Sequence, residues 1–255
     1  MNTKFFINNG FIKFKLNKKH LNGIKKFLVR KIKKRTKKKS VNLNFFHNSY
    51  PLEKVNNLRL YLYNEINSDK KIQNLIYKSS EEVINYAVGS EIAKSKANLS
   101  IQYPKDENSL LSMHSDFFSG ESLFQVNLWI PFVNVKKTKS MFIINPKMSL
   151  EILKKIKFSK KITFDEIYKK YKKKMKWLNV RYGEGIIFSP NCLHGNVKNS
   201  EKTTRWSINI RYKNLYSPYN DIFGNEKKIG TFYNIFSPKM ITQFNLKHNF
   251  NEFQE

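Results

Sequence analysis

The segment LLSMHSDFFSG places a histidine two residues before an aspartate, at His114 and Asp116, within an otherwise apolar and aromatic stretch. In an extended chain, residues i and i+2 point to the same face, so these two side chains are expected to lie close together. A neutral imidazole and a carboxylate on one face can supply two ligands to a divalent metal ion. The alternative interpretation is a hydrogen-bonded His114 beside an Asp116 that caps the turn at FFSG.

A third metal ligand is expected from a second histidine at the end of a later strand. His194 closes the segment GEGIIFSPNCLHGN, in which a glycine-bounded turn precedes an apolar run and a proline. Together with His114 and Asp116 it makes a two-histidine, one-carboxylate set, which leaves positions open on Fe(II). The remaining histidines lie among lysines, before the predicted strands and in a polar tail, at His20, His47 and His248.

A candidate anion-binding pair follows this histidine. Ten residues separate His194 from Arg205, and the alternation of RWSINIRY places Arg205 and Ser207 on one face of a strand. A guanidinium group binds a carboxylate through two parallel hydrogen bonds, and a neighbouring hydroxyl can add another. The pair could therefore hold the far end of a dicarboxylate cosubstrate. Arg211, on the same face, is a competing candidate, and a surface salt bridge is the alternative role for Arg205.

Composition indicates one folded domain with a substantial core. The chain has 255 residues, of which 40% are hydrophobic and 15% aromatic. The single cysteine, Cys192, excludes an intramolecular disulfide and a cysteine-based zinc cluster, and it favours a reducing, cytoplasmic setting. The N-terminus lacks the pattern of a signal peptide, and no segment has the uninterrupted apolar length of a transmembrane helix.

The net charge of +29 would attract nucleic acids, anionic membranes and phosphorylated small molecules. Lysine and asparagine are abundant throughout the chain, however, and evenly spread lysine indicates no particular partner. The most basic segment, KKFLVRKIKKRTKKKS (25–40), fits an amphipathic helix with a basic tail. It is interpreted either as a peripheral contact with an anionic membrane or as a solvated lysine-rich helix. No nucleic-acid-binding motif is present, so no specific nucleic-acid partner is expected.

The texture of the sequence suggests three parts within a single domain. Residues 1–96 are expected to form a mostly helical region that packs on the core. Residues 97–215 contain many short β-branched and aromatic runs without a βαβ rhythm, which predicts a mainly β sandwich or jelly roll with flanking helices. A lysine-rich insertion occupies 147–176, and a C-terminal extension occupies 216–255.

Two helices and one strand are well marked within these parts. Helices are predicted over 51–67 and 80–95, with Gly89 able to end or break the second. Strict alternation over 122–133 predicts a strand whose apolar face, from Phe124 to Phe132, lies against the core. The opposite face carries Gln125, Asn127 and Trp129.

The HxD pair, the later histidine and the arginine beyond it resemble the 2-oxoglutarate/Fe(II)-dependent oxygenases, specifically the phytanoyl-CoA dioxygenase-like branch. The segments IQYPKDENSLLSMHSDFFSGESLFQVNLWIPFVNV, KSMFIINP and GEGIIFSPNCLHGN are similar to the members found in bacterial surface-carbohydrate gene clusters. The resemblance covers about residues 90–215, and the lysine-rich insertion has no counterpart in it.

The resemblance implies a double-stranded β-helix, also called a jelly roll or cupin-like fold, with catalytic iron held by His114, Asp116 and His194. It further implies 2-oxoglutarate as cosubstrate, bound by Arg205 and Ser207, with Trp129 beside it and Asn127 facing the same way. Because the aspartate is present, the related halogenases, which replace it with a small residue, are disfavoured.

The implied activity is that of an oxidoreductase, a dioxygenase that uses O2 and 2-oxoglutarate to oxidise, most simply to hydroxylate, a C–H bond. The family context suggests a sugar, or a nucleotide- or lipid-linked sugar, in surface-polysaccharide biosynthesis, and the positive charge suits a phosphorylated carrier. Two alternatives stay open: a metal-binding jelly-roll isomerase or hydrolase that does not use 2-oxoglutarate, and a basic nucleic-acid-binding protein whose binding would depend steeply on salt.

Overall fold

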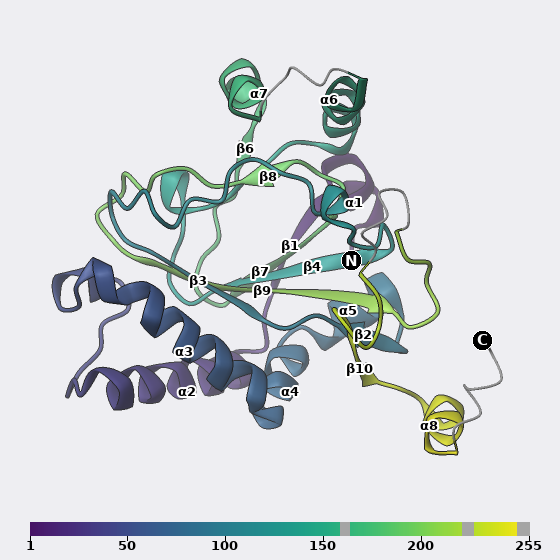
Figure 1. The fold of residues 1–255 in the computed structure, drawn as a ribbon, viewed down its shortest axis with the longest axis horizontal. Coiled ribbons are helices and arrows are strands. Elements are labelled where there is room, and N and C mark those ends of the chain that lie inside the picture. Colours follow the sequence, from purple (N-terminus) through teal and green to yellow (C-terminus); the bar gives the residue numbers. More distant parts are fainter. Residues whose placement is uncertain (159–163, 221–226, 249–255) are drawn as a thin grey trace.

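The structure is a computed structural model that describes residues 1–158, 164–220 and 227–248 (Figure 1). Its main sheet has the strand order β1-β7-β4-β9-β2-β10, and β3 pairs with β9 beside β2. Every pairing in it is antiparallel. The strands are β1 (Phe11–Lys15), β2 (Ile92–Lys94), β3 (Asn98–Gln102), β4 (Gln125–Pro131), β7 (Glu184–Phe188), β9 (Arg205–Asn214) and β10 (Asn234–Ser237).

A smaller antiparallel sheet, in the order β6-β5-β8, faces the main sheet across a cavity that both sheets line. Its strands are β5 (Phe142–Ile143), β6 (Lys176–Trp177) and β8 (His194–Gly195). An isolated antiparallel bridge between His114 and His194 extends this sheet by one more segment. Two facing antiparallel sheets with flanking helices confirm the predicted jelly-roll fold.

Helices cover the outer faces of both sheets. Figure 1 shows α2, α3 and α4 below the main sheet and α6 and α7 above the smaller one. The α-helices are α1 (Thr3–Asn9), α2 (Lys18–Thr36), α3 (Val55–Ser68), α4 (Lys70–Lys78), α5 (Glu81–Val88), α6 (Pro146–Phe158), α7 (Phe164–Tyr171) and α8 (Met240–Lys247). Short 3-10 turns are η1 (Phe46–Asn48), η2 (Leu52–Lys54), η3 (Asp116–Ser119), η4 (Lys137–Lys139) and η5 (Lys172–Lys174).

The N-terminal region contains more than helices. The helix predicted over 80–95 ends at Val88, because Gly89 adopts a φ of 81° and residues 92–94 form strand β2 instead. Strand β1 pairs with β7 at one end of the main sheet, a pairing that the sequence did not indicate. Two strands from within 1–96 thus belong to the main sheet, and the division of the chain near residue 96 stays a prediction.

Strand β4 is shorter than the run of alternation that predicted it, since Leu123 and Phe124 precede it and are exposed. Its apolar face, with Leu128 and Ile130, is buried in the core as predicted. The opposite face is buried as well: Trp129 lines the cavity between the sheets, and Asn127 and Gln125 contact Asp116 and Glu121.

The lysine-rich insertion has an apolar side that packs behind the smaller sheet. Residues of α6 and α7 share one buried cluster with the residues that immediately precede His114 and His194. The cluster contains Met113, Phe142, Ile144, Ile152, Leu153, Ile167, Met175 and Leu193. The described part of the insertion therefore supports, from outside, the two segments that carry the candidate histidine ligands.

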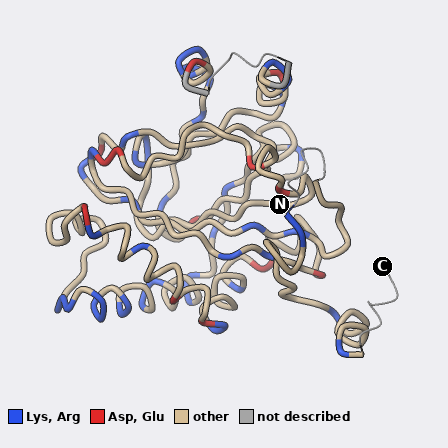
Figure 2. Tube along the Cα trace, viewed as in Figure 1, with Lys and Arg blue, Asp and Glu red and all other residues tan. Residues whose placement is uncertain are grey.

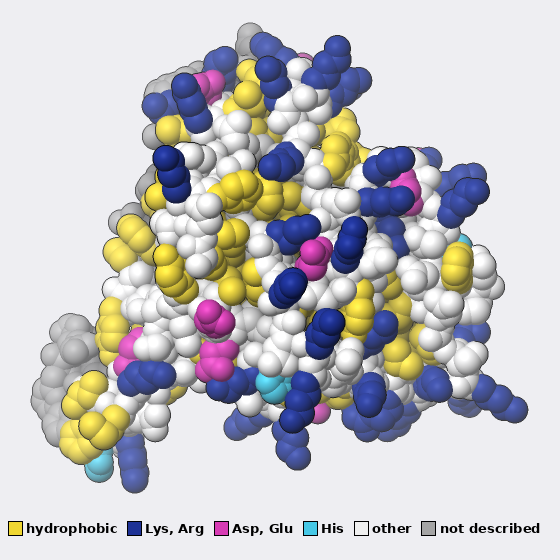
Figure 3. Space-filling view, turned by 180° about the vertical axis from the view of Figure 1, so that it is seen from behind, with side chains coloured by type: hydrophobic (Ala, Val, Ile, Leu, Met, Phe, Trp, Pro, Cys, Tyr) yellow, Lys and Arg dark blue, Asp and Glu magenta, His cyan; other side chains and the backbone are white. Residues whose placement is uncertain are grey.

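Cations are spread over most of the surface. Figure 2 shows Lys and Arg on helices at opposite edges of the molecule, and Figure 3 shows them across the face seen from behind. Within the described ranges, no helix combines the length and the hydrophobicity needed to cross a bilayer.

Gly10 links the N-terminal strand to the loop before His194. It ends α1 with a φ of 75°, and a Cβ atom there would stand 2.2 Å from the Sγ of Cys192. We expect Gly10→Ala to lower the free energy of unfolding by about 3 kcal/mol, from left-handed strain and overpacking. In urea denaturation, adding Cys192→Ala should recover the overpacking part of this loss. If the losses in free energy of unfolding from the two substitutions were strictly additive in the double variant, the close approach of Gly10 to the Sγ of Cys192 would be contradicted.

Candidate metal centre

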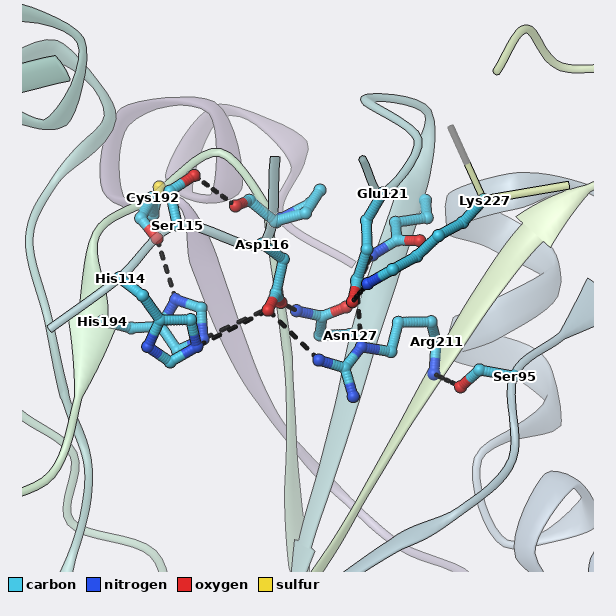
Figure 4. Close-up of polar contacts among 12 residues, drawn as sticks. Ser95, His114, Ser115, Asp116, Glu121, Asn127, Cys192, His194, Arg211 and Lys227 are labelled. Atoms are coloured by element: carbon cyan, nitrogen blue, oxygen red, sulfur yellow. Dashed lines mark hydrogen bonds and ion pairs between the residues drawn. The ribbon is translucent and has the colours of Figure 1, made fainter. Parts of the chain in front are cut away.

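His114 and His194 are neighbours on adjacent segments. Their backbones exchange two hydrogen bonds, each with an N···O distance of 2.9 Å. Residues opposite one another in an antiparallel pair place their side chains on the same face. The two imidazole rings accordingly lie with their centroids 4.3 Å apart, facing the cavity (Figure 4).

The backbone also fixes how each imidazole is turned. The Nδ1 of His114 lies 2.8 Å from the carbonyl of Ser112, and the Nδ1 of His194 lies 2.9 Å from the carbonyl of Cys192. Because a carbonyl only accepts, each Nδ1 carries the proton and donates it. This leaves the Nε2 lone pairs free, an arrangement typical of histidines that bind metals.

Asp116 completes the set. Its Oδ1 lies 3.5 Å from the Nε2 of His114, and its Oδ2 lies 3.8 Å from the Nε2 of His194. All three ligand atoms lie within 4.8 Å of one another. Two imidazole nitrogens and a carboxylate oxygen suit Fe(II) and other first-row divalent metals. Asp116 begins the turn η3, but its side chain points to the two histidines.

Electrostatics keep Asp116 and His194 in the protonation states that a metal requires, whereas the pKa of His114 is raised, because the nearby Asp116 outweighs the effect of burial. Burial alone would raise the pKa of Asp116, but the neighbouring imidazoles of His114 and His194 and the positive charge of Arg211 hold that pKa well below its ordinary value. Burial and the neighbouring His114 lower the pKa of His194 to about 4. At neutral pH, Asp116 is thus a carboxylate and His194 a neutral imidazole.

Asp116 is held from the side opposite the histidines. The Nδ2 of Asn127 donates to its Oδ2, and the Nη2 of Arg211 donates to its Oδ1 at 3.1 Å. The Nε of Arg211 donates to the Oε2 of buried Glu121 at 3.0 Å, and the Nζ of Lys227 lies 3.0 Å from the other oxygen of that carboxylate. Arg211 is therefore engaged with two carboxylates of the protein itself.

Glu121 and Lys227 are site residues that the sequence did not reveal. A further pair completes their surroundings: Gln125 donates to the Oε2 of Glu121 at 2.6 Å, and Tyr233 donates to Gln125. Asn127, predicted to face the cosubstrate, instead contacts Asp116 and Gln125. The alternation of β9 was the one sequence signal that placed Arg211 on this face.

Arg205 differs from Arg211 in having no anionic partner among the described residues. Its side chain is buried, with 4% of the residue exposed, and it donates only to Ser100 Oγ at 3.1 Å and to the carbonyl of Ser140 at 3.4 Å. Within the described ranges, the Nε of Arg205 and the Oγ of Ser207 have no hydrogen-bond partner. Burial lowers the pKa of Arg205 to about 10, so the group stays charged at neutral pH. A buried, uncompensated guanidinium is costly, and an anionic ligand would relieve that cost.

One cavity of about 1000 Å³ connects these features. Arg205, Ser207 and Trp129 line it together with the metal-binding set. Its lining also includes amide and hydroxyl side chains, those of Asn56, Asn98, Ser100, Asn108, Ser109, Asn196 and Asn209. The structure thus gathers all the predicted site residues around one space, except that Asn127 lies behind Asp116. His20, His47 and His248 are not part of the three-ligand cluster.

Solved structures of non-heme oxygenases share this fold. The non-heme monooxygenase ThoJ, in a nickel complex, matches with a TM-score of 0.52 at 12% identity, over 97% of this chain and 94% of its own. The non-heme alpha ketoglutarate dependent carbocyclase SnoK from nogalamycin biosynthesis matches with a TM-score of 0.55 at 11% identity, over 91% and 95%. EctD from S. alaskensis, in its apoform, matches with a TM-score of 0.56 at 12% identity, over 89% and 82%.

No protein-family model matches the sequence, and no curated protein matches it. At the identities found among the solved structures, the similarity establishes the fold. The chemistry of this chain has to be argued from its own side chains.

The charge balance around Asp116 can be tested in the metal-free protein. We expect Arg211→Met to lower the free energy of unfolding by about 3–5 kcal/mol, because it leaves two buried carboxylates undercompensated. Lys227→Met, which removes a partner that is 25% exposed, should cost less than about 1 kcal/mol. Adding Ni²⁺ should stabilise the Arg211 variant more than the wild type, since the ion supplies the missing positive charge. Equal losses of stability in the Arg211 and Lys227 variants on chemical denaturation would contradict this account. So would equal stabilisation of the Arg211 variant and the wild type by Ni²⁺.

Proposed function

We propose that the chain is an Fe(II)- and 2-oxoglutarate-dependent oxygenase. The observation that carries the proposal is the buried guanidinium of Arg205, which has no acidic partner among the described residues and lines the same cavity as the cluster of His114, Asp116 and His194. A metal site alone fits many reactions. A metal site that shares its cavity with an uncompensated cation specifically suits a ligand with one metal-binding end and one free carboxylate, and 2-oxoglutarate is such a ligand.

The residues present fit both groups. His114, Asp116 and His194 would hold Fe(II) through two imidazoles and a carboxylate. Arg205 would bind the far carboxylate of 2-oxoglutarate, and Ser207 would donate its unpaired hydroxyl to the same group. When bound, iron and 2-oxoglutarate supply the oxidation of a C–H bond with O2, while the protein supplies position and shielding.

The protein side of this mechanism is an assembly of fixed groups. The Ser112 and Cys192 carbonyls keep the proton of each histidine on Nδ1, away from the metal. Asn127 and Arg211 hold the carboxylate of Asp116. Trp129 lines the same cavity as Arg205 and contributes to the wall that limits the access of water. No protein nucleophile is needed.

The solved structures with the same fold support the proposal. SnoK is described as alpha ketoglutarate dependent, and ThoJ as a non-heme monooxygenase with nickel bound. The same fold in those proteins therefore carries a metal site and, in SnoK, dependence on the cosubstrate that we assign here. The rival jelly-roll isomerase or hydrolase leaves Arg205 without a role, and a nucleic-acid-binding protein leaves the whole cluster without one.

For the substrate, we propose a sugar or a carrier-linked sugar, in line with the resemblance to the phytanoyl-CoA dioxygenase-like branch. The amide and hydroxyl side chains in the cavity lining can hydrogen-bond to a polyhydroxylated molecule. Arg59 also lines the cavity and suits a phosphorylated carrier. A cytoplasmic place for the reaction stays a prediction from cysteine usage.

The experiment is 2-oxoglutarate turnover by the iron-loaded protein, measured as succinate formed. Because a hydrogen bond to a charged group contributes about 1.5–3 kcal/mol, Arg205→Ala should raise the KM for 2-oxoglutarate by about 10- to 100-fold. Arg205→Lys, which keeps the charge without the planar fork, should fall between that variant and the wild type. The exposed Arg181 offers a matched control, and Arg181→Ala should behave as wild type.

Two results would contradict the proposal. One is the absence of succinate formation from folded wild-type protein that has bound iron. The other is turnover with an unchanged KM in Arg205→Ala, which would exclude Arg205 as the anchor of the cosubstrate.

A further inference from the structure

Helix α2 carries a stripe of exposed cations, none of which forms an ion pair with another described residue. Its buried side consists of Leu21, Ile24, Phe27, Leu28 and Ile32. Four exposed cations follow the opposite side at helical spacing, at Lys19, Lys26, Arg30 and Lys33, and are called the α2 stripe here. The helix contains no Asp or Glu. Among the described residues, its one ion pair is formed by Lys31 with Glu65, outside the stripe.

The surface beside the α2 stripe is hollowed. A depression of about 580 Å³, called the Tyr182 hollow here, is lined by Lys26, Arg30, Lys33, Lys25 and Tyr182, together with Val29 and Asn22. The Nζ of Lys25 lies over the ring of Tyr182, 4.2 Å from its centroid. Four cations thus line a concave surface beside a half-buried aromatic ring, and such groups suit phosphates.

Helix α8 adds uncovered apolar side chains flanked by cations. Met240 is 85% exposed and Ile241 62% exposed. Tyr216, 71% exposed, is tied to this helix by a hydrogen bond between its hydroxyl and that of Thr242. Lys239 and Lys247, at the two ends of the helix, are both exposed. Apolar and aromatic groups bordered by cations are the composition of segments that lie in a membrane interface.

These two features project toward the same side of the molecule. In Figure 1, α2 and α8 both reach the lower edge, below the main sheet. Figure 2 shows cation-bearing turns of α2 along that edge, and Figure 3 shows Lys and Arg side chains along it from behind. A flat surface could therefore contact both helices without displacing the core.

We propose that this side, made by the α2 stripe, the Tyr182 hollow and α8, docks on an anionic membrane. Lipid phosphates would pair with the stripe, and Met240 and Ile241 would enter the interface. A nucleic acid would satisfy the cations but give exposed apolar side chains on α8 no partner. A second copy of the chain would cover α8 but bring together two molecules that each carry a net charge of +29.

The test is flotation of the full chain with vesicles of phosphatidylglycerol and phosphatidylcholine, at about physiological salt. Binding should require the anionic lipid. Because a Lys or Arg near such a surface contributes about fivefold to partitioning, Lys26→Gln/Arg30→Gln/Lys33→Gln should weaken binding by about a hundredfold. Met240→Ser/Ile241→Ser should weaken it by about tenfold without altering charge. Binding should not depend on iron or 2-oxoglutarate, so the result is independent of the proposed oxygenase activity.

A matched triple variant on α6, Lys147→Gln/Lys154→Gln/Lys155→Gln, removes the same charge from exposed positions at the opposite edge. It should retain binding within about threefold, since diffuse charge is screened over about 8 Å at this salt. Equal losses in the two triple variants would overturn the docking surface, as would no binding to anionic vesicles. Tighter binding to a DNA duplex through the stripe alone, or a dimer in sedimentation that Met240→Ser/Ile241→Ser abolishes, would assign the surface to another partner and overturn the proposal.

Discussion

The site depends on one short antiparallel bridge, in which the backbones of His114 and His194 bind each other through two hydrogen bonds. The bridge requires a close approach of the two segments, and Gly195 permits it: a Cβ atom there would lie 2.9 Å from the carbonyl oxygen of Leu111. Strand alternation then directs Met113 and Leu193 outward into the apolar cluster of α6 and α7, and directs both histidines into the cavity. The lysine-rich insertion thus acts on the site through packing behind it.

The second constraint is that charged side chains buried around the cavity need partners of opposite charge. The charges of Asp116 and Glu121 are compensated by Arg211 and by Lys227, whereas the charge of Arg205 is compensated by no acidic residue in the part of the chain that the structure describes. The two arginines on the same face of β9 therefore have different roles. Arg211 holds the carboxylate of Asp116, which is a predicted metal ligand, whereas Arg205 can bind the carboxylate of a small molecule. The alternation of the strand places both arginines on one face, so it does not distinguish their roles. The acidic residues that other elements place beside Arg211 do.

The sequence reveals the part of the site that depends on local spacing. The i, i+2 spacing of His114 and Asp116, the strand-end position of His194 and the alternation of β9 each follow from short-range geometry. The contacts of Glu121 with Arg211 and Lys227 span 90 and 106 residues and follow no periodicity, so only the folded chain shows them. For the same reason the pairing of β1 with β7 was missed, because a five-residue run among helices gives no sign of a partner more than 160 residues away.

The most direct test of the account is an anaerobic titration of Fe(II) and 2-oxoglutarate, followed by visible absorption. If the three residues hold iron and Arg205 orients the cosubstrate, a weak charge-transfer band will saturate at one iron and one 2-oxoglutarate per chain. The band should be absent in His114→Ala and retained in His47→Ala, a histidine of this chain outside the cluster. Absence of the band from folded, iron-loaded wild-type protein would contradict the central claim.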